Sequence, residues 1–521
     1  MDKFDPIEFE LFKNMFVSVS EEMGAVLGRT SLSPNIKERK DFSCALFDRK
    51  GETFSQGSHI PVHLGAMPLS VQASIHAVDF KEGDLVILND PYRGGTHLPD
   101  ITCISPLFVD KKLTFFVANR AHHSDVGGMT PGSMPLATEI FQEGIIIPPL
   151  KLIRKGRLNT EVLELILANV RTPEERKGDL QAQIAANEKG KQRLAEILNK
   201  YGLKKILHYT RLIPLYTEKI LRETIKDIPD GTYAFTDYLD DDGITDDPVE
   251  ISVQITIKDD KALIDFSSSS RQVQGCVNAS FAVTYSAVLY VFRCLVEEDI
   301  PFNTGLMRPL KIIAPAGSVL NAQHPAATAG GNVETSQRIV DVLLGAFSKA
   351  IPEKIPAASS GTMNNVAFGG YDPVRKRSFA YYETIGGGMG AGSDSSGISG
   401  VHTHMTNSLN TPLEALEIYL PLKIKTYCLR KGSGGQGQHP GGEGIIREYE
   451  FHVPAQVTII SERRKFSPYG IQKGKSGKRG KNTLFTKGKK VPLKSKCNFK
   501  VQPGDLLRVE TPGGGGYGQK K

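Results

Sequence analysis

The sequence predicts a mixed α/β (α+β) protein of more than one domain. The chain has 521 residues, which exceeds what a single hydrophobic core usually supports. Apolar stripes at helical spacing alternate along the chain with short strand-like apolar runs. A hydrophobic content of 40% and a charged content of 23% are ordinary for a water-soluble globular protein.

Changes in texture along the chain predict four regions. Residues 1–158 form an N-terminal α/β region that carries candidate metal-binding loops, and residues 159–230 form a helical segment. Residues 231–442 form a central α/β region rich in glycine, and residues 443–521 form a β-rich C-terminal lobe. These boundaries follow from shifts between helical periodicity, alternating strands and glycine-rich stretches.

The N-terminal region begins with a helix and a hairpin. Residues 5–28 place apolar side chains at helical spacing, which predicts one long helix with a buried stripe. The runs DFSCALFD and ETFSQG flank a turn at 48–51 and predict a hairpin. Asp41 stands at the entrance of its first strand, where a carboxylate points either into a cleft or into solvent. His59 and His63 precede a second helix predicted over 66–78.

The stretch from 89 to 128 presents the same His-x-x-Asp spacing twice. His97 and Asp100 form the first pair, and His122 and Asp125 form the second. Imidazole and carboxylate together are a ligand set that suits Zn, Mn or Fe(II). A single such pair is a weak signal, because surface loops carry these residues by chance, but a repeated pair favours a metal site.

A predicted hairpin joins the two pairs. The segment LFVDKKLTFFVAN contains two apolar runs separated by a charged turn at 110–112. Both His-x-x-Asp loops then lie at the same end of one sheet. Asp90 ends the preceding strand DLVILND, so it either belongs to the site or fixes a turn before Pro91.

Two later segments offer candidate substrate contacts. Arg338 follows GGNVETSQ on the first turns of a predicted helix, where it is placed to hold an anionic substrate, although an ordinary capped helix explains the same residues. The glycine-rich segment 381–417 delivers His404 and Asn407 ahead of another helix, and its glycines are candidates for an anion-holding nest.

Composition excludes several classes of function. The net charge is +7, and fourteen Lys or Arg residues lie between 463 and 500, but the run KGKSGKRGKN within this segment has no interleaved aromatic residues. The run KGKSGKRGKN and its surroundings show no recognisable nucleic-acid fold, so we expect a solvated loop or a docking surface for an acidic partner, and no nucleic acid. The chain has no apolar run long enough to span a membrane, and its first residues resemble no secretion signal, so we expect a cytoplasmic protein.

Seven motifs together resemble the hydantoinase B family. They are NDPYRGGTHLPDI, NRAHHSDVGG, EGIIIPPLKL, GDLQAQIAAN, GNVETSQRIVD, HMTNSLNTPLEALE and TPGGGGYG, which are spread over nearly the whole chain. This family includes the B subunit of ATP-dependent N-methylhydantoinase, the C-terminal half of 5-oxoprolinase and the alpha subunit of acetone carboxylase.

The resemblance implies a hetero-oligomeric enzyme. A hydantoinase A type subunit phosphorylates the oxygen of a lactam, hydantoin or ketone with ATP, and the B subunit completes the reaction at a divalent metal. This chain has no GxxxxGK[ST] motif, which fits that division of labour. The expected activity is that of an ATP-dependent cyclic amide hydrolase. The alternatives are an acetone-carboxylase-like subunit and a non-catalytic scaffold.

The resemblance also assigns roles to individual residues. It implies a Zn or Mn site, with His97, Asp100 and His122 also serving as catalytic residues, and with four metal ligands: Asp41, His97, Asp100 and His122. We expect His123, Asp125 and Asp90 to support these ligands without binding the metal. Arg338, His404 and Asn407 are the candidate contacts for substrate or phosphate.

Overall fold

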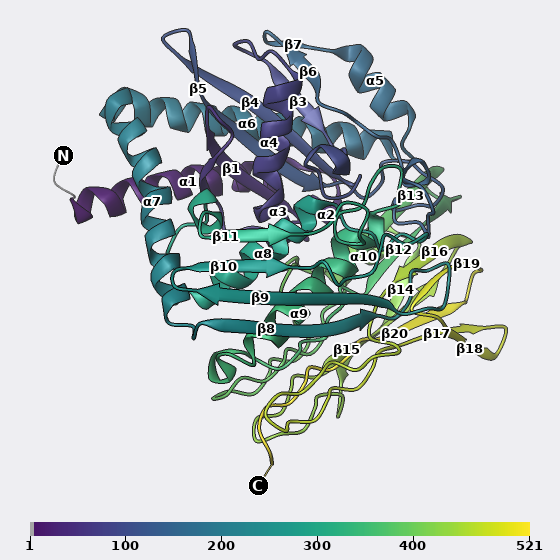
Figure 1. Cartoon of the computed structure of the whole chain (residues 1–521). Coiled ribbons are helices and arrows are strands. Elements are labelled where there is room, and N and C mark those ends of the chain that lie inside the picture. Colours follow the sequence, from purple (N-terminus) through teal and green to yellow (C-terminus); the bar gives the residue numbers. More distant parts are fainter. Residues whose placement is uncertain (1–4, 521) are drawn as a thin grey trace.

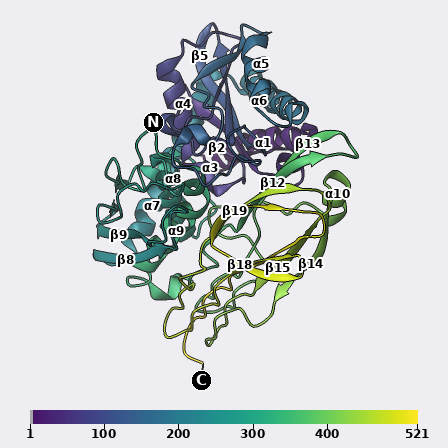
Figure 2. The same cartoon turned by 90° about the vertical axis from the view of Figure 1, so that its right-hand side faces the viewer.

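The computed structural model describes residues 5–520, and Figures 1 and 2 show it from two directions. Strands in this part of the chain form four sheets, of seven, four, four and five strands. The N-terminal sheet and its helices lie at the top of both views, and the C-terminal strands lie below them. The mixed α/β class with several sheets is therefore confirmed.

The first sheet is antiparallel, with the strand order β2-β1-β5-β4-β3-β6-β7. Its centre is the predicted hairpin, whose turn residues Asp110 and Lys111 have φ values of 49° and 61°. Two successive positive φ values give a turn whose twist matches that of the flanking strands. The strands of the sheet are β1 (Phe42–Asp48), β2 (Thr53–Gln56), β3 (Leu85–Leu88), β4 (Asp100–Val109), β5 (Lys112–His122), β6 (Leu150–Arg154) and β7 (Arg157–Leu158).

Helices cover both faces of this sheet. Successive side chains of a strand point to opposite faces, so Cys44 and Leu46 of β1 pack toward α1 while Ala45 and Phe47 pack toward α4. This two-sided burial explains why β1 reads as an almost continuous apolar run. The helices of this region are α1 (Pro6–Thr30), α2 (Pro34–Lys37), α3 (Pro61–Leu64) and α4 (Ala66–Ala77), with the short turns η1 (Pro91–Arg93) and η2 (Ile140–Gln142).

The predicted helical segment consists of three helices. They are α5 (Thr160–Ala168), α6 (Pro173–Tyr201) and α7 (Leu203–Lys226). Pro173 occupies the first turn of α6, where its missing N–H costs nothing, and Gly202 with a φ of 78° separates α6 from α7. None of the helices within residues 5–520 combines the length and apolar character needed to cross a membrane.

The second sheet has the order β11-β10-β9-β8, and helices α8 and α9 pack together beside it. A π-helical turn, η4, leads directly into α9. The elements are β8 (Gly231–Leu239), β9 (Val249–Lys258), β10 (Lys261–Asp265), β11 (Leu310–Ile313), α8 (Phe281–Leu295), η3 (Thr304–Met307), η4 (Gly331–Thr335), α9 (Ser336–Phe347) and η5 (Pro352–Lys354).

The two remaining sheets have the orders β13-β12-β16-β19 and β14-β15-β20-β17-β18. Both sheets combine strands from either side of residue 443, so the predicted boundary there divides them, and 443–521 is not a separate lobe. The elements are β12 (Asn365–Asp372), β13 (Arg377–Glu383), α10 (Leu413–Tyr419), β14 (Leu422–Arg430), β15 (Gly444–Phe451), β16 (Ala455–Ile460), β17 (Lys481–Thr486), β18 (Lys489–Leu493), β19 (Lys496–Val501) and β20 (Leu506–Glu510).

Glycine-rich segments from distant parts of the chain lie against one another beside these sheets. Gly514 donates its N–H to the carbonyl of Gly442, and Gly442 donates to that of Met389. A Cβ on Gly514 would lie 2.0 Å from the carbonyl oxygen of Met389, so only glycine fits at this distance. The N–H of Gly388 likewise donates to the carbonyl of Pro512. These glycines therefore bond to neighbouring backbone, which corrects the expectation of an anion-holding nest.

The basic segment 463–500 is not one solvated loop. It includes β17, β18 and most of β19, and two of its cations, Arg463 and Lys496, are buried. Lys496 forms ion pairs with Glu462 and Asp241, and Arg463 with Asp341. Burial of these cations is possible because each has a carboxylate partner.

Candidate metal centre

Three side chains meet at one end of the central hairpin, and we call His97, Asp100 and His122 the metal group. Asp100 is the first residue of β4 and pairs directly with His122, the last residue of β5. His97 lies on the loop before β4, and its carbonyl accepts the N–H of Asp100 at 3.1 Å. The sheet register therefore places all three at one point, as the repeated spacing predicted.

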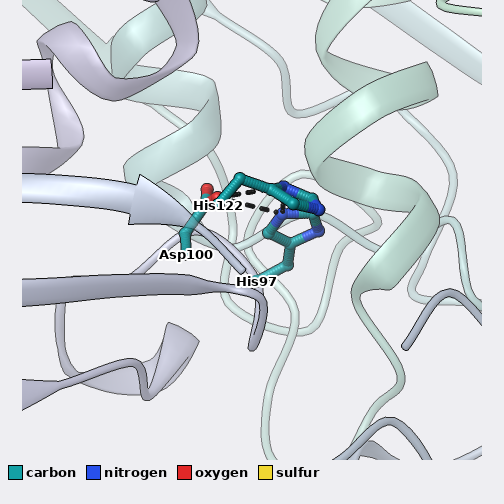
Figure 3. A group of neighbouring side chains, drawn as sticks. All are labelled: His97, Asp100 and His122. Atoms are coloured by element: carbon teal, nitrogen blue, oxygen red, sulfur yellow. Dashed lines mark hydrogen bonds and ion pairs between the residues drawn. The ribbon is translucent and has the colours of Figure 1, made fainter. Parts of the chain in front are cut away.

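The metal group is compact and almost completely buried (Figure 3). The distances His97 Nε2–Asp100 Oδ1, His122 Nδ1–Asp100 Oδ1 and His97 Nε2–His122 Nδ1 are all 3.3 Å. Three donor atoms at this spacing have a common point about 2 Å from each, close to ordinary Zn–N and Zn–O bond lengths. Asp100 Oδ1, which faces both imidazoles, is buried without a hydrogen-bond partner among the described residues. The donor set and the unpartnered carboxylate oxygen of Asp100 fit a divalent metal.

Hydrogen bonds fix which nitrogen of His97 faces the group. Its Nδ1 donates to the carbonyl of Ala329 at 3.3 Å, which leaves Nε2 free of its proton for a metal. Glu143 holds that loop, because its Oε1 accepts the N–H groups of Thr328 and Ala329 at 2.7 and 2.8 Å. Burial raises the pKa of Glu143 to about 7. The buried carboxyl group of Glu143 therefore holds the loop that orients His97.

The second oxygen of Asp100 is occupied by the protein. Oδ2 lies within hydrogen-bonding distance of Thr96 Oγ1, 3.3 Å from His63 Nε2 and 3.4 Å from Asn332 Nδ2. Burial alone would raise the pKa of Asp100, but the imidazoles of His97, His63 and His122 hold it well below its usual value. Asp100 is therefore a carboxylate that turns its free oxygen, Oδ1, toward the two histidine ligands.

The aromatic ring of Tyr382 supports His122. Its ring stacks on Tyr382, with the ring centroids 4.5 Å apart and the planes 11° from parallel. The hydroxyl of Tyr382 donates to Asn365 Oδ1 at 2.7 Å, and Asn365 Nδ2 donates to Glu334 at 2.6 Å. Burial raises the pKa of Glu334 to about 7. The π-helical turn η4 thus supports the metal group in two ways: Asn332 contacts Asp100 directly, and Glu334 acts through Asn365 and Tyr382. Such turns are frequent at functional sites.

Sequence reasoning missed two residues of this site. His63 lies on α3 and reaches Asp100 from thirty-seven positions earlier, and its Nδ1 is 3.1 Å from Ser43 Oγ. Asn332 comes from the start of the segment before α9. His63 was visible as one of two histidines before a helix, but nothing in its spacing connected it to Asp100.

The predicted fourth ligand, Asp41, is nearby but outside the closest group. Its carbonyl accepts the N–H of His122 at 3.0 Å, and the residue is 9% exposed. Within residues 5–520 the ligand atoms that lie within 4.8 Å of one another belong to His97, Asp100 and His122. Ligation by Asp41 stays a prediction.

The three predicted supporting residues have partners elsewhere in the chain. His123 Nε2 lies 3.0 Å from Gln183 Oε1 on α6. Asp125 pairs with Arg171 at 3.0 Å and accepts N–H groups of its own loop. Asp90 accepts the N–H of Tyr92 at 2.9 Å and so caps η1. Their side chains fix the loops around the metal group. Among the described residues, no hydrogen bond or ion pair joins Asp125 to an imidazole of the metal group.

The predicted substrate contacts do not gather at one place. Arg338 is fully buried in what we call the arginine cluster, formed by Arg338, Arg463, Asp237 and Asp341. The ring centroid of His404 lies 6.0 Å from that of Tyr290, and burial lowers the pKa of His404 to about 4. Asn407 is exposed and donates to the carbonyl of His59 at 3.2 Å. Substrate binding by these residues stays a prediction.

The fold and the metal group define a class of protein whose buried imidazole–carboxylate centre suits a divalent metal. Residues 5–520 match the Hydantoinase B/oxoprolinase family, and the chain belongs to this family. The chain is 42% identical to 5-oxoprolinase 1 of Arabidopsis thaliana, covering 99% of this chain but 42% of that one. It is 31% identical to the B subunit of a putative D-/L-hydantoinase from a Pseudomonas species, covering 99% and 90%.

Two solved structures share the fold. The ATP-dependent caprolactamase of Pseudomonas jessenii superposes with a TM-score of 0.92 at 27% identity, covering 99% of this chain and 92% of that one. An acetone carboxylase in its nucleotide-free form superposes with a TM-score of 0.90 at 18% identity, covering 99% and 76%. The predicted family and fold class are confirmed, and the resemblance to acetone carboxylase concerns the fold alone.

Proposed function

We propose that this chain is the metal-bearing subunit of an ATP-dependent cyclic amide hydrolase. A hydantoinase A type partner phosphorylates the amide oxygen of a lactam or cyclic imide, and this chain opens the activated ring. The metal group carries the proposal, because two imidazoles and a carboxylate oxygen converge there without a cation of their own. Similarity to the B subunit of a putative hydantoinase and to an ATP-dependent caprolactamase supports it.

His97, Asp100 and His122 would hold the metal, which when bound supplies a water of lowered pKa and polarises an oxygen. The protein sets the shape of that site. Ala329 directs the free nitrogen of His97 inward, and Asn332 turns Asp100 Oδ1 toward the same point. Because the group is buried, bulk water is kept from a reactive phosphorylated ring.

The chemistry of ring opening consumes two water molecules. The first adds to the activated carbon and breaks the C–N bond, so that the nitrogen leaves with a proton as an amine. The second hydrolyses the resulting acyl phosphate, which gives a carboxylate and inorganic phosphate. Phosphorylation is needed because an unactivated amide is a poor electrophile.

The test is an assay of the chain together with a hydantoinase A type partner. With ATP and a lactam or hydantoin, we expect ring-opened product and phosphate, and no product when either protein is omitted. A parallel assay with a ketone and bicarbonate separates the acetone-carboxylase-like alternative, since only that reaction fixes carbon. A complex that fixes carbon and leaves lactams unchanged would contradict the proposal, and a metal-free chain that supports full activity would favour a scaffold.

A further inference from the structure

A cavity of about 570 Å³ lies next to the chain on either side of Asp41, and we call it the basic basin. It is lined by the C-terminal half of α1, by the chain on either side of Asp41 and by the loops that carry His59 and Asn407. Arg29, Lys37 and Lys40 are its cations. All three residues are exposed, so an ion in the basin would meet them directly.

The three cations of the basin have no partner among residues 5–520. No hydrogen bond or ion pair joins the side chain of Arg29, Lys37 or Lys40 to any described residue, whereas many other surface cations are paired. The single carboxylate of the basin, Glu21, accepts the N–H of Ser58 at 2.6 Å. Three cations against one carboxylate leave two net positive charges in one concave site, which focuses a positive potential there.

The imidazole of His59 also lines the basin. His59 Nδ1 accepts the N–H of Cys44 at 3.2 Å, so the proton of the ring is carried by Nε2. A Cβ on Gly24 would lie 2.5 Å from that Nε2, so the glycine leaves room for the ring against α1. Nε2 lies 3.7 Å from Glu21 Oε2, so the ring N–H faces the carboxylate of the basin. The free donors that suit the oxygens of a phosphate group are therefore the three cations.

The basin and the metal group share one wall. Lys40 and Phe42 line the basin, and the residue between them, Asp41, accepts the backbone N–H of His122. Lys40 has a φ of 54°, a left-handed conformation that residues other than glycine seldom adopt.

We propose that the basic basin binds the phosphoryl group of the activated substrate beside the metal group. This inference rests on the proposed function, which supplies a phosphorylated lactam or imide. The charge, the unpartnered donors and the shared wall all favour a small phosphate ester over a neutral ring. Holding the phosphoryl group would keep the activated ring from escaping and hydrolysing back to the lactam and phosphate.

The direct test titrates the full-length chain with inorganic phosphate. The variant Lys37→Gln/Lys40→Gln removes two cations and keeps side-chain length, and Lys489→Gln/Lys490→Gln on exposed β18 is its control of equal charge. We expect phosphate affinity to fall about tenfold in the first variant, to be unchanged in the control, and to weaken as salt is added. Phosphate binding that is absent, or equal in both variants, would overturn the basin as a phosphate site.

A second measurement separates the activated substrate from released phosphate. In the complex with the A type partner, we expect the first variant to consume more ATP for each ring opened, because the phosphorylated ring escapes. Unchanged coupling with weakened phosphate inhibition would mean that the basin holds only the released phosphate and would overturn the assignment to substrate. Loss of copurification with the partner would instead show that the basin is a docking surface, which also overturns it.

The two proposals fail separately. Phosphate binding to the isolated chain needs no partner and no turnover, so a positive titration stands even if the complex opens no ring. A complex that opens rings with full coupling in both variants supports the proposed function and rejects the basin.

Discussion

The metal group and the arginine cluster are both buried groups of polar and charged side chains, yet only the arginine cluster contains its own cations. In the arginine cluster, Arg338 and Arg463 contact the carboxylates of Asp237 and Asp341 at distances of 2.5–3.0 Å. In the metal group, a carboxylate oxygen faces two imidazole nitrogens at 3.3 Å without a hydrogen bond of its own. The arginine cluster matches two carboxylates with two cations of the chain, whereas the metal group offers three donor atoms to a cation from outside.

This difference separates stability from function. A buried ion pair is costly to break, because the remaining partner is an unpaired charge in a poor solvent. A metal group, by contrast, can lose one ligand with little effect on the metal-free fold while losing its metal. Substitutions in the two groups should therefore differ in whether they change activity or stability.

Replacing His97 should abolish ring opening. The substitution His97→Ala removes one of three converging ligand atoms, so we expect turnover with the A type partner to fall by about a thousandfold or more. Circular dichroism should show the same fold, because the backbone pairing of β4 with β5 does not depend on the His97 side chain. The exposed His76 on α4 gives the control His76→Ala, which should keep full turnover. Normal turnover in His97→Ala would reject the metal group as the reaction centre.

Replacing Arg338 should unfold the chain more readily. Arg338→Met keeps the volume but leaves Asp237 and Asp341 short of a cation, which should cost about 3–5 kcal/mol of stability. A lower thermal midpoint with unchanged metal content would show that Arg338 stabilises the fold and does not take part in metal binding. A variant with normal stability and lost activity would instead support the predicted contact between Arg338 and substrate.

Replacing Asn332 should weaken metal binding without removing a ligand. Asn332→Ala frees Asp100 Oδ2 from one donor, and a loss of support of this kind typically costs about 10–100-fold in metal affinity. His63→Ala should act in the same direction through the same oxygen. Zn²⁺ titration of the metal-free protein measures both. Affinity equal to that of the unaltered chain would mean that Asp100 is oriented without them.

Metal binding should strengthen as the pH rises. Burial alone would lower the pKa of His97, but Asp100 raises it above the ordinary value of 6.5. A proton on Nε2 competes with the metal, so affinity should increase by up to about tenfold per pH unit below that raised pKa and level off above it. Zn²⁺ dissociation constants measured between pH 5.5 and 8.5 test this. Metal affinity that falls as the pH rises over this range would contradict the predicted direction.

The sequence predicted much of the metal group because its residues are close along the chain. A hairpin with a two-residue turn brings Asp100 opposite His122, and the loop before β4 adds His97. His63 and Asn332 escaped prediction because they reach Asp100 from α3 and from η4, and no local pattern reports such distant contacts.

Other residues have partners within the chain that their local sequence did not reveal. Arg338 resembled an anion contact because its helix start was recognisable, while Asp237, which pairs with it, lies about one hundred positions earlier. The glycine-rich segments resembled a nest because glycine N–H groups bind anions, but those N–H groups bond to the backbone of other glycine segments. The residue types in each segment suggested anion binding, but contacts with distant segments determine which partners these groups have.

The most direct test of a metal requirement is the metal content of the purified full-length chain. Elemental analysis after reconstitution with Zn²⁺ or Mn²⁺ should find about one metal ion per chain in the unaltered protein and in His76→Ala. The variant His97→Ala should contain much less. A chain that holds no stoichiometric metal after reconstitution, or one that holds as much after the loss of His97, would contradict the account.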